Sequence, residues 1–392
     1  MAATSQRFGA AVVGAGPAGI AVVGNLLARG VRDVLWVDPV FSAGRLHKKY
    51  REVPSNTKVS LFVQFAEAVK PFEDIISNTP SPHAVDHLES LDQDRGCRLS
   101  AAADMCRMLT EGLVKRSVTQ AVGRVRTAGW KRSAWSIDVD GQDEKQAASS
   151  QTADLLVLCN GSHPKSIPLP DSCKHITNIH LDTALAPSIL RNSIRQDQLA
   201  TIAVIGTSHS AVLALLNLYT LAKSSHPNLH IKWFARSKLL YAVPKDGWIL
   251  YDNTGLKGEA AVWAKEHLED DKLKTNAVVP YIEKVELGAN ESFTESARLQ
   301  ECSHIVQAIG YSRNPLPELL MNGQPLRLKH NPYSGGYEDQ NGKKVPSLYG
   351  AGIAWPETVK DPYGNVESAV GLFKFMRFAK RAVPEWMEIA AL

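Results

Sequence analysis

The chain has few cysteines, and none of them is spaced as a redox pair or as a metal site. The five are Cys97, Cys106, Cys159, Cys173 and Cys302. Their number is odd and no two are separated by two residues, which argues against a disulfide framework and against a redox-active C-x-x-C motif. The Cys/His spacing of zinc sites is also missing, so we expect no metal. This pattern favours a reducing compartment, and we expect a cytoplasmic protein.

Strong charge of one sign and long uninterrupted apolar runs are also missing. Lys and Arg number 44 against 40 Asp and Glu, and the basic residues are scattered, so we expect no nucleic-acid partner. The apolar start, residues 8–28, is interrupted by three glycines and a proline within residues 14–19 and lacks a basic flank with a cleavage site. It therefore predicts neither a signal peptide nor a membrane span. A homo-oligomer remains open.

A glycine-rich turn follows the first apolar strand. The elements come in the order strand 8–13, turn Gly14-Ala-Gly16-Pro-Ala-Gly19, helix 20–28, strand 34–37 and terminal Asp38. This order is the βαβ fingerprint of a dinucleotide-binding fold. Gly14 permits a tight turn, Gly16 lets the backbone approach a pyrophosphate, and Gly19 lets the helix pack on the strand. Asp38, 19 residues past Gly19, has the spacing of a ribose-binding acid.

A second, weaker fingerprint lies near the middle of the chain. A strand over residues 201–205 precedes Gly206-Thr-Ser208-His-Ser-Ala211, and the next strand, 230–235, ends at Arg236-Ser237. An NAD site favours an acid at that strand end, whereas a cation suits the 2′-phosphate of NADPH. We therefore predict NADPH rather than NADH. The alternative is a surface arginine at a strand end.

Two later strands end in short glycine segments, and their placement carries a resemblance. One runs over 153–158 into Cys159-Asn160-Gly161, and the other over 303–307 into Ala308-Ile309-Gly310. This order resembles the superfamily of thioredoxin reductases and class B flavin monooxygenases, in which such strands mark the crossovers between an FAD domain and an NADPH domain. The first fingerprint then holds FAD.

The resemblance implies an α/β fold with two Rossmann-like three-layer domains, the NADPH domain being inserted in the FAD domain. We expect the FAD-binding domain over residues 1–165 and 301–392 and the NADPH domain over 166–300. Residues 239–268 exceed what a βαβ link needs. They are either a cap over the active site or a packed surface elaboration.

The resemblance also suggests residues near the flavin. Asn56 follows Tyr50 by six positions, as does an asparagine beside the flavin ring in class B monooxygenases. The alternative for Asn56 is turn chemistry after Pro54. His180 is a loose counterpart of the histidine in that family's fingerprint, which is otherwise not intact here, and a structural role for it is equally open.

The carboxyl-terminal part resembles the family's final strand and glycine turn at Gly352. A helix over residues 366–382, capped by Asn365, is then expected to direct its N-terminus at the flavin. Arg45 is expected on the FAD pyrophosphate, with a solvated basic surface run as the alternative. The predicted FAD contacts are Gly14, Gly16, Ala18, Gly19, Asp38, Arg45, Val125, Asn160, Gly161, Gly352 and Val366. The predicted NADPH contacts are Gly206, Ser208, Arg236 and Ser237.

These features favour an FAD-dependent, NADPH-using monooxygenase that oxygenates a small organic molecule, with Asn56 and His180 as candidate catalytic residues. As in the related family, O₂ would add at flavin C4a before transfer to the substrate. A disulfide reductase is disfavoured because no dithiol motif is present. Two alternatives stay open: an FAD-dependent oxidase or cyclase with a vestigial NADPH fold, and a non-catalytic FAD-binding protein.

Overall fold

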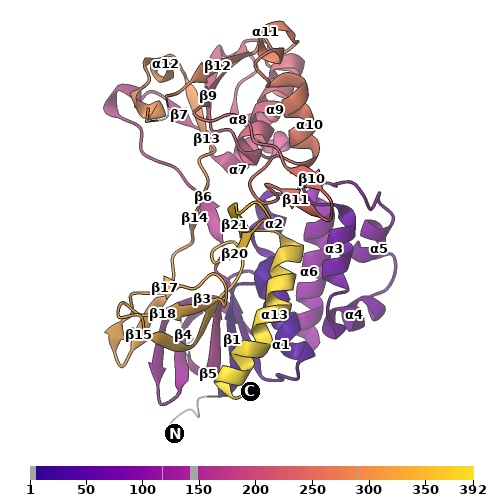
Figure 1. The fold of residues 1–392 in the computed structure, drawn as a ribbon, viewed down its shortest axis with the longest axis vertical. Helices are drawn as coiled ribbons and strands as arrows, with labels where there is room; N and C mark the ends of the chain where they lie inside the picture. The colour runs from indigo at the N-terminus through magenta and orange to yellow at the C-terminus, as the bar shows by residue number, and fades with distance from the viewer. Residues whose placement is uncertain (1–5, 117, 142–148, 289) are drawn as a thin grey trace.

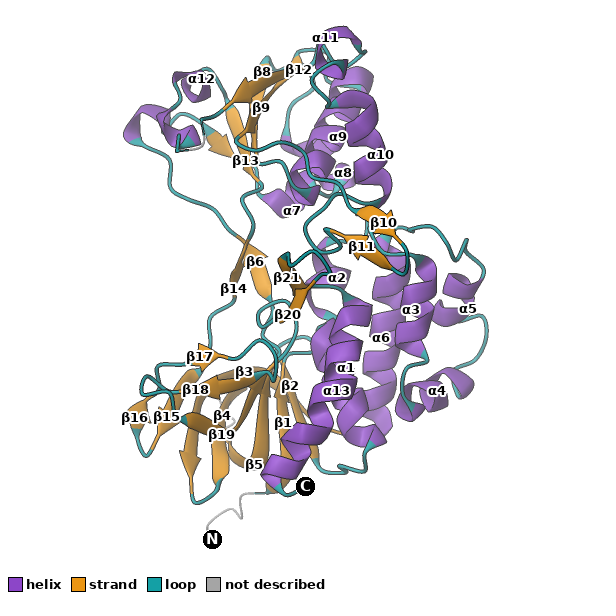
Figure 2. Ribbon diagram, in the orientation of Figure 1, coloured by secondary structure: helices purple, strands orange, loops and turns teal. Residues whose placement is uncertain are grey.

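The computed structural model describes residues 6–116, 118–141, 149–288 and 290–392, which form two β-sheets with helices packed on them (Figure 1). The larger sheet and its helices occupy the lower part of the view, and the smaller sheet the upper part (Figure 2). The predicted α/β class with Rossmann-like folds is therefore confirmed. No helix in the described ranges combines the length and apolar character that a membrane crossing requires.

Within the described residues, the larger sheet has ten strands with a parallel centre. Its order is β16-β15-β3-β2-β1-β5-β19-β18-β17, and β4 pairs with both β3 and β5. The strands are β1 (Arg7–Val13), β2 (Val34–Asp38), β3 (Val118–Lys131), β4 (Ala134–Gly141), β5 (Ser149–Leu158), β15 (Glu318–Met321), β16 (Gln324–Pro325), β17 (Lys329–His330), β18 (Gly336–Glu338) and β19 (Lys344–Gly350). In β1, Val12 lies opposite Trp36 of β2 and Val157 of β5, so β1 is the buried centre.

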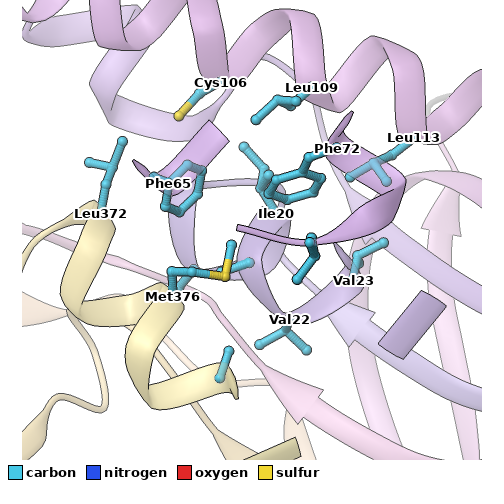
Figure 3. Packing of buried hydrophobic residues seen from close by; sticks show 14 of the residues in the cluster. Ile20, Val22, Val23, Phe65, Phe72, Cys106, Leu109, Leu113, Leu372 and Met376 are labelled. Atoms are coloured by element: carbon cyan, nitrogen blue, oxygen red, sulfur yellow. The ribbon is translucent and has the colours of Figure 1, made fainter. Parts of the chain in front are cut away.

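Helices cover one face of this sheet and a β-meander covers the other. The helices are α1 (Pro17–Ala28), α2 (Gly44–Lys49), α3 (Val59–Ala66), α4 (Lys70–Ser77), α5 (Ala84–Glu89), α6 (Leu99–Arg116) and α13 (Leu372–Ala390). Their apolar side chains, among them Ile20, Phe65, Phe72 and Met376, pack into one core (Figure 3). Trp135 of β4 belongs to a second core on the opposite face. The result is the expected three-layer arrangement.

The smaller sheet is wholly parallel, with the order β12-β9-β8-β13-β7. Its strands are β7 (Thr177–Asn178), β8 (Ala200–Ile205), β9 (Leu229–Ala235), β12 (Ile282–Glu286) and β13 (His304–Gln307). The helices of this part are α7 (Leu181–Ala184), α8 (Pro187–Ser193), α9 (His209–Ser224), α10 (Gly258–His267), α11 (Lys272–Thr275) and α12 (Ala297–Gln300). β13 joins this sheet, although the boundary expected at residue 300 assigned it to the first domain.

The chain crosses between the two sheets twice, after β5 and after β13. The crossing segments form an antiparallel ribbon of β6 (Ser162–Pro164) and β14 (Tyr311–Arg313), in which Ser312 lies opposite His163 (Figure 2). Both segments directly follow the short glycine sequences that were expected to mark crossovers.

Residues 239–268, which were expected either to cap the active site or to pack as a surface elaboration, contain a two-stranded hairpin and the helix α10, and the two pack against different parts of the fold. In α10, Ala260, Trp263 and Ala264 are buried in the core of the smaller sheet, so the helical part is not a lid. The hairpin of β10 (Val243–Lys245) and β11 (Trp248–Leu250) is the part that lies beside the helices of the larger sheet (Figure 1).

The expected helix over residues 366–382 was wrong at its start. Residues 357–369 form a hairpin of β20 (Glu357–Lys360) and β21 (Val366–Ala369), and α13 begins only at Leu372. The reason lies in the intervening turn, where the Asp361 carboxylate accepts hydrogen bonds from the backbone N–H groups of Tyr363 and Asn365. Asn365 therefore closes a hairpin turn and does not cap a helix. Val366 is 66 % exposed on β21.

Candidate functional site

The first glycine turn is built so that its middle residue faces open space. Gly14 has φ +106°, and a Cβ there would lie 2.3 Å from the carbonyl oxygen of Cys159. A Cβ on Gly19 would lie 1.9 Å from the Gly14 carbonyl oxygen. A Cβ on Gly16 would meet nothing within 4 Å. Packing therefore requires Gly14 and Gly19, and the space beside Gly16 at the N-terminus of α1 fits the pyrophosphate of FAD.

Trp36 and Asp38 hold this turn from the neighbouring strand. The indole Nε1 of Trp36 donates to the Gly14 carbonyl at 3.0 Å. One Asp38 oxygen accepts from the Ala15 N–H at 2.8 Å, and the other accepts from the N–H groups of Val40 and Phe41. Asp38 thus lies at the strand end, where the ribose-binding acid was expected, and it also fixes the backbone on both sides of that position.

The remaining expected FAD residues differ in where they lie relative to the first glycine turn. Gly352 has φ +90°, and a Cβ there would lie 2.4 Å from the Cβ of Ala18, so the final turn packs on the first turn of α1. Val125 of β3 is buried, at 8 % exposure, and lies opposite Val139 of β4. The side chain of Val366 stands on the β20–β21 hairpin, away from a helix start.

Asn160 belongs to a closed hydrogen-bond network at the first crossover. Its side-chain amide donates to the Asn314 carbonyl at 2.8 Å, and the Asn314 amide donates back to the Asn160 carbonyl at 2.7 Å. The indole of Trp355 donates to Asn160 Oδ1 at 3.0 Å. Gly161, with φ +69°, accepts from the Asn314 N–H. This network ties the two crossing segments together beside the glycine turn.

The second glycine turn repeats the construction of the first. Gly206 has φ +124°, and a Cβ there would lie 2.6 Å from the carbonyl oxygen of Ala308. The indole of Trp233 donates to the Gly206 carbonyl at 2.7 Å. Gly206 therefore meets the crossover strand β13 as Gly14 meets β5. The turn leads into α9, whose N-cap Ser208 is exposed.

The expected NADPH residues gather at this second turn. The hydroxyls of Thr207 and Ser237 lie 2.8 Å apart, which brings the end of β9 beside the glycine turn. Arg236 is exposed, and its side chain has no hydrogen-bond or ion-pair partner among the residues that the structure describes. A free guanidinium beside a helix N-terminus is suited to a phosphate monoester.

Arg45 does not lie free beside the first glycine turn. It forms an ion pair with Asp182, which is buried, and it donates to the Tyr50 hydroxyl at 3.2 Å. The Tyr50 hydroxyl lies 3.4 Å from that of Tyr311 on the crossing ribbon. His180 caps α7 by accepting the Asp182 N–H at Nδ1. Arg45 and His180 thus both contact Asp182, and this contact joins α2 of the larger-sheet part to α7 of the smaller-sheet part.

Asn56 lies in an exposed loop against the N-terminus of α10. Its Oδ1 accepts from the Thr57 hydroxyl at 3.3 Å. A Cβ on Gly258 would lie 3.0 Å from the Ser55 carbonyl oxygen and 3.6 Å from the Asn56 Cα. The Asn56 loop therefore touches the start of α10, which packs in the core of the smaller sheet.

A network that the sequence did not reveal joins the β10–β11 side to α13. The buried Glu367 accepts from the backbone N–H groups of Asn253 and Thr254, at 3.2 and 3.1 Å. Asp252 accepts from Lys257 and from Lys374 of α13. Burial alone would raise the pKa of Asp252, but the two lysines outweigh it and lower that pKa. Apart from Lys257 and Asp252, the paired residues are 113 or more positions apart in the sequence. No local sequence pattern could therefore have revealed these contacts.

The five cysteine thiols form no disulfide bonds, and most of them are buried. All five are free, and four are buried. Burial raises the pKa of Cys159 to about 12 and that of Cys302 to about 11. These thiols stay protonated at neutral pH and are poor nucleophiles.

Two glycine turns of the same construction, each between a parallel strand and a helix, with an acid after the first and a cation after the second, define a protein with two dinucleotide-binding folds. The chain belongs to the pyridine nucleotide-disulphide oxidoreductase family, whose pattern it matches over residues 8–360.

Monooxygenase AgnR1 of Paecilomyces divaricatus is 50 % identical over 387 residues, covering 97 % of this chain and 98 % of that protein. The chain is an FAD-dependent oxidoreductase of the monooxygenase kind.

Solved structures share the fold at low sequence identity. The cadaverine monooxygenase DfoA of Erwinia amylovora aligns with a TM-score of 0.63 at 11 % identity, covering 99 % of this chain and 95 % of that one. The bacillithiol disulfide reductase YpdA of Staphylococcus aureus aligns with a TM-score of 0.57 at 11 % identity, covering 98 % and 99 %. At these identities the likeness concerns the fold, which serves both oxygenation and disulfide reduction.

Proposed function

We propose that this protein is an NADPH-dependent monooxygenase that transfers one oxygen atom of O₂ to a small organic molecule. The balance is NADPH, a proton, O₂ and substrate giving NADP⁺, water and the oxygenated product. Bound FAD would accept a hydride from NADPH and deliver the electrons to O₂. The observation that carries the choice of NADPH is the unpaired Arg236 beside the Thr207–Ser237 contact.

The residues have distinct proposed roles. Gly14, Gly16, Ala18 and Gly19 hold the FAD pyrophosphate at the start of α1, and Asp38 holds the ribose. Asn160, Gly161 and Gly352 form the wall beside the flavin, and Val125 contributes its backbone. Gly206, Ser208, Arg236 and Ser237 hold the adenosine 2′-phosphate and pyrophosphate of NADPH.

The candidate catalytic residues are proposed with different functions. Asn56, exposed between the two sheets, is proposed to contact the reacting centre and to donate or accept a hydrogen bond there. His180 is proposed as a positioning residue, because its ring holds the backbone next to Asp182, the partner of Arg45. Arg45 is engaged in that contact and is no longer proposed to bind pyrophosphate. Val366 was expected to contact FAD as the first residue of a helix. Because α13 begins only at Leu372, no FAD contact is proposed for Val366.

The state of the cysteines disfavours disulfide reduction. A disulfide reductase of this fold needs two thiols that reach the flavin, and every cysteine here is separate. The raised pKa values of Cys159 and Cys302 work against thiolate chemistry as well.

The test is anaerobic mixing of the FAD-loaded protein with NADPH or with NADH, followed by the visible flavin absorbance. We expect NADPH to bleach the flavin at least about tenfold faster than NADH at equal concentration, a difference of about 1.4 kcal/mol. Failure of both nucleotides to bleach the flavin would overturn the NADPH assignment. Oxygen consumption with an organic substrate alone would then indicate an oxidase.

A further inference from the structure

A cavity of about 410 Å³ lies between the β10–β11 hairpin, the β20–β21 hairpin and α13. Its apolar wall includes Trp248 and Ile249 of β11 and Val359 of β20. The volume falls in the range of small-molecule sites, which are commonly near 300–1,000 Å³. The two hairpins lie near each other in the middle of the view (Figure 1), and residues of both line the cavity.

The acids that line the cavity are already engaged. Asp252 binds Lys257 and Lys374, and Glu357 pairs with Arg381 at 2.7 Å. Asp361 accepts from the turn that follows it. Glu367, the fourth acid, accepts from the backbone N–H groups of residues 253 and 254. These carboxylates have little capacity left for a ligand.

Two cations that line the cavity are not engaged in this way. Lys360 of β20 and Arg377 of α13 are exposed, and within the described ranges neither side chain has an ion-pair or hydrogen-bond partner. The lining holds three cations and the four acids named above; Lys374 binds Asp252, so Lys360 and Arg377 are the cations left for a ligand. Their free donors suit an anionic group, and Arg377 offers a bidentate contact to a carboxylate.

The apolar part of the cavity suits an aromatic ring. Trp248 packs edge-on against Tyr363, with ring centroids 5.0 Å apart at an interplanar angle of 85°. Ile249, which lines the cavity, is 38 % exposed, and Tyr363, which packs on the lining residue Trp248, is 67 % exposed. Such side chains gathered at one opening commonly mark a ligand site.

The wall of the cavity is connected to the loop that carries Asn56. Lys257 binds Asp252 of the cavity wall, and the adjacent Gly258 lies against the Asn56 loop. Asp252 in turn binds Lys374, which follows the start of α13 by two residues. The cavity wall is thus connected to the Asn56 loop through Asp252, Lys257 and Gly258.

We propose that this cavity binds an aromatic anion, a carboxylate or phenolate, and that this molecule is the substrate class of the monooxygenase. Lys360 and Arg377 hold the anionic group, and Trp248 lies against the ring. The assignment as substrate rests on the proposed function, whereas the binding site itself does not.

Isothermal titration of the FAD-loaded protein with 2-naphthoate and with the neutral 2-naphthamide tests the site. We expect 2-naphthoate to bind at least about tenfold more tightly than the amide, and Arg377→Gln and Lys360→Gln each to remove most of that preference. Lys343→Gln, an exposed lysine in a different turn, is the matched control and should bind as the unaltered protein does. Equal binding of acid and amide, or full binding by both variants, would overturn the site. If inorganic phosphate by itself displaced naphthoate, the proposal that the site recognises an aromatic ring would be overturned.

Anaerobic flavin bleaching by NADPH in the same preparations separates this inference from the proposed function. Naphthoate binding without bleaching would leave the site standing and overturn the NADPH assignment. Bleaching without naphthoate binding would leave the NADPH assignment standing and overturn the site. If both occur, naphthoate should raise the aerobic rate of NADPH oxidation severalfold in the unaltered protein and not in Arg377→Gln; no change in rate would overturn its role as substrate class.

Discussion

The indole N–H of Trp233 donates to the carbonyl oxygen of Gly206 at 2.7 Å, and this contact fixes the second glycine turn from the neighbouring strand. Trp36 makes the same contact to Gly14 at 3.0 Å in the first fold. Both tryptophans are buried. Each nucleotide turn is therefore held by one buried side-chain donor, and the two folds can be perturbed separately.

Replacing these tryptophans by phenylalanine should affect one nucleotide at a time. Loss of a buried donor leaves a turn carbonyl without its partner, at a cost of about 1–3 kcal/mol. Trp233→Phe should raise the KM for NADPH on the order of tenfold and leave the FAD content unchanged. Trp36→Phe should lower FAD retention on gel filtration. Each variant is the control for the other, and a loss of FAD in Trp233→Phe would contradict the separation.

Alanine at Gly16 and at Gly19 should give two different defects. A methyl group at Gly16 meets no protein atom within 4 Å but would occupy the space assigned to the pyrophosphate. Gly16→Ala should fold with a near-normal circular dichroism spectrum and lose FAD. A methyl group at Gly19 would lie 1.9 Å from a backbone oxygen, so Gly19→Ala should be recovered poorly or melt lower. FAD binding by Gly16→Ala with unchanged affinity would disprove the placement.

Reversal of charge at Arg236 should change the preferred nucleotide. Arg236→Asp places a carboxylate where the 2′-phosphate is expected, and it restores the acid that suits a free ribose. The KM for NADPH should rise at least about tenfold, while the KM for NADH should stay equal or fall. Arg327→Asp changes an exposed arginine of the other domain and serves as the control. An unaltered NADPH to NADH ratio in Arg236→Asp is the outcome that contradicts the assignment.

Stability should fall as the pH decreases from about 6.5 toward 4. Burial lowers the pKa of His209 and of His330 to about 4, and nearby Lys257 and Arg313 contribute in the same direction. A histidine in the unfolded chain ionises near pH 6.5, so the unfolded state binds more protons in this window. The free energy of unfolding then decreases by at most about 1.4 kcal/mol per pH unit for each histidine, and the full contribution is present above pH 6.5.

Thermal midpoints measured at steps of pH with FAD present will show this dependence. His209→Gln and His330→Gln should each flatten the profile between pH 6.5 and 5. His230→Gln, which alters an exposed histidine of β9, should leave the slope as it is. Profiles of equal slope in all variants would mean that these two buried rings do not drive the loss.

The local backbone features of the two nucleotide turns could be predicted from the sequence. Gly14 and Gly206 adopt positive φ, and each has a carbonyl where a Cβ would stand. Such requirements concern a few consecutive residues and the strand beside them, so a glycine at that spacing after an apolar strand is informative by itself. The α/β class followed from the same kind of local pattern, and the crossing segments were expected from the resemblance to the flavoprotein superfamily.

Only the tertiary structure decided which charged side chains meet. Arg45 pairs with Asp182, 137 positions away, and Glu367 binds the backbone 114 and 113 positions away, because packing of the two sheets brings these segments together. The hairpin at residues 357–369 likewise depends on Asp361, whose carboxylate stabilises the turn before residues 366–369, where a helix was expected to begin. Sequence spacing specifies the conformation of a turn, whereas contacts between distant residues depend on how whole elements pack.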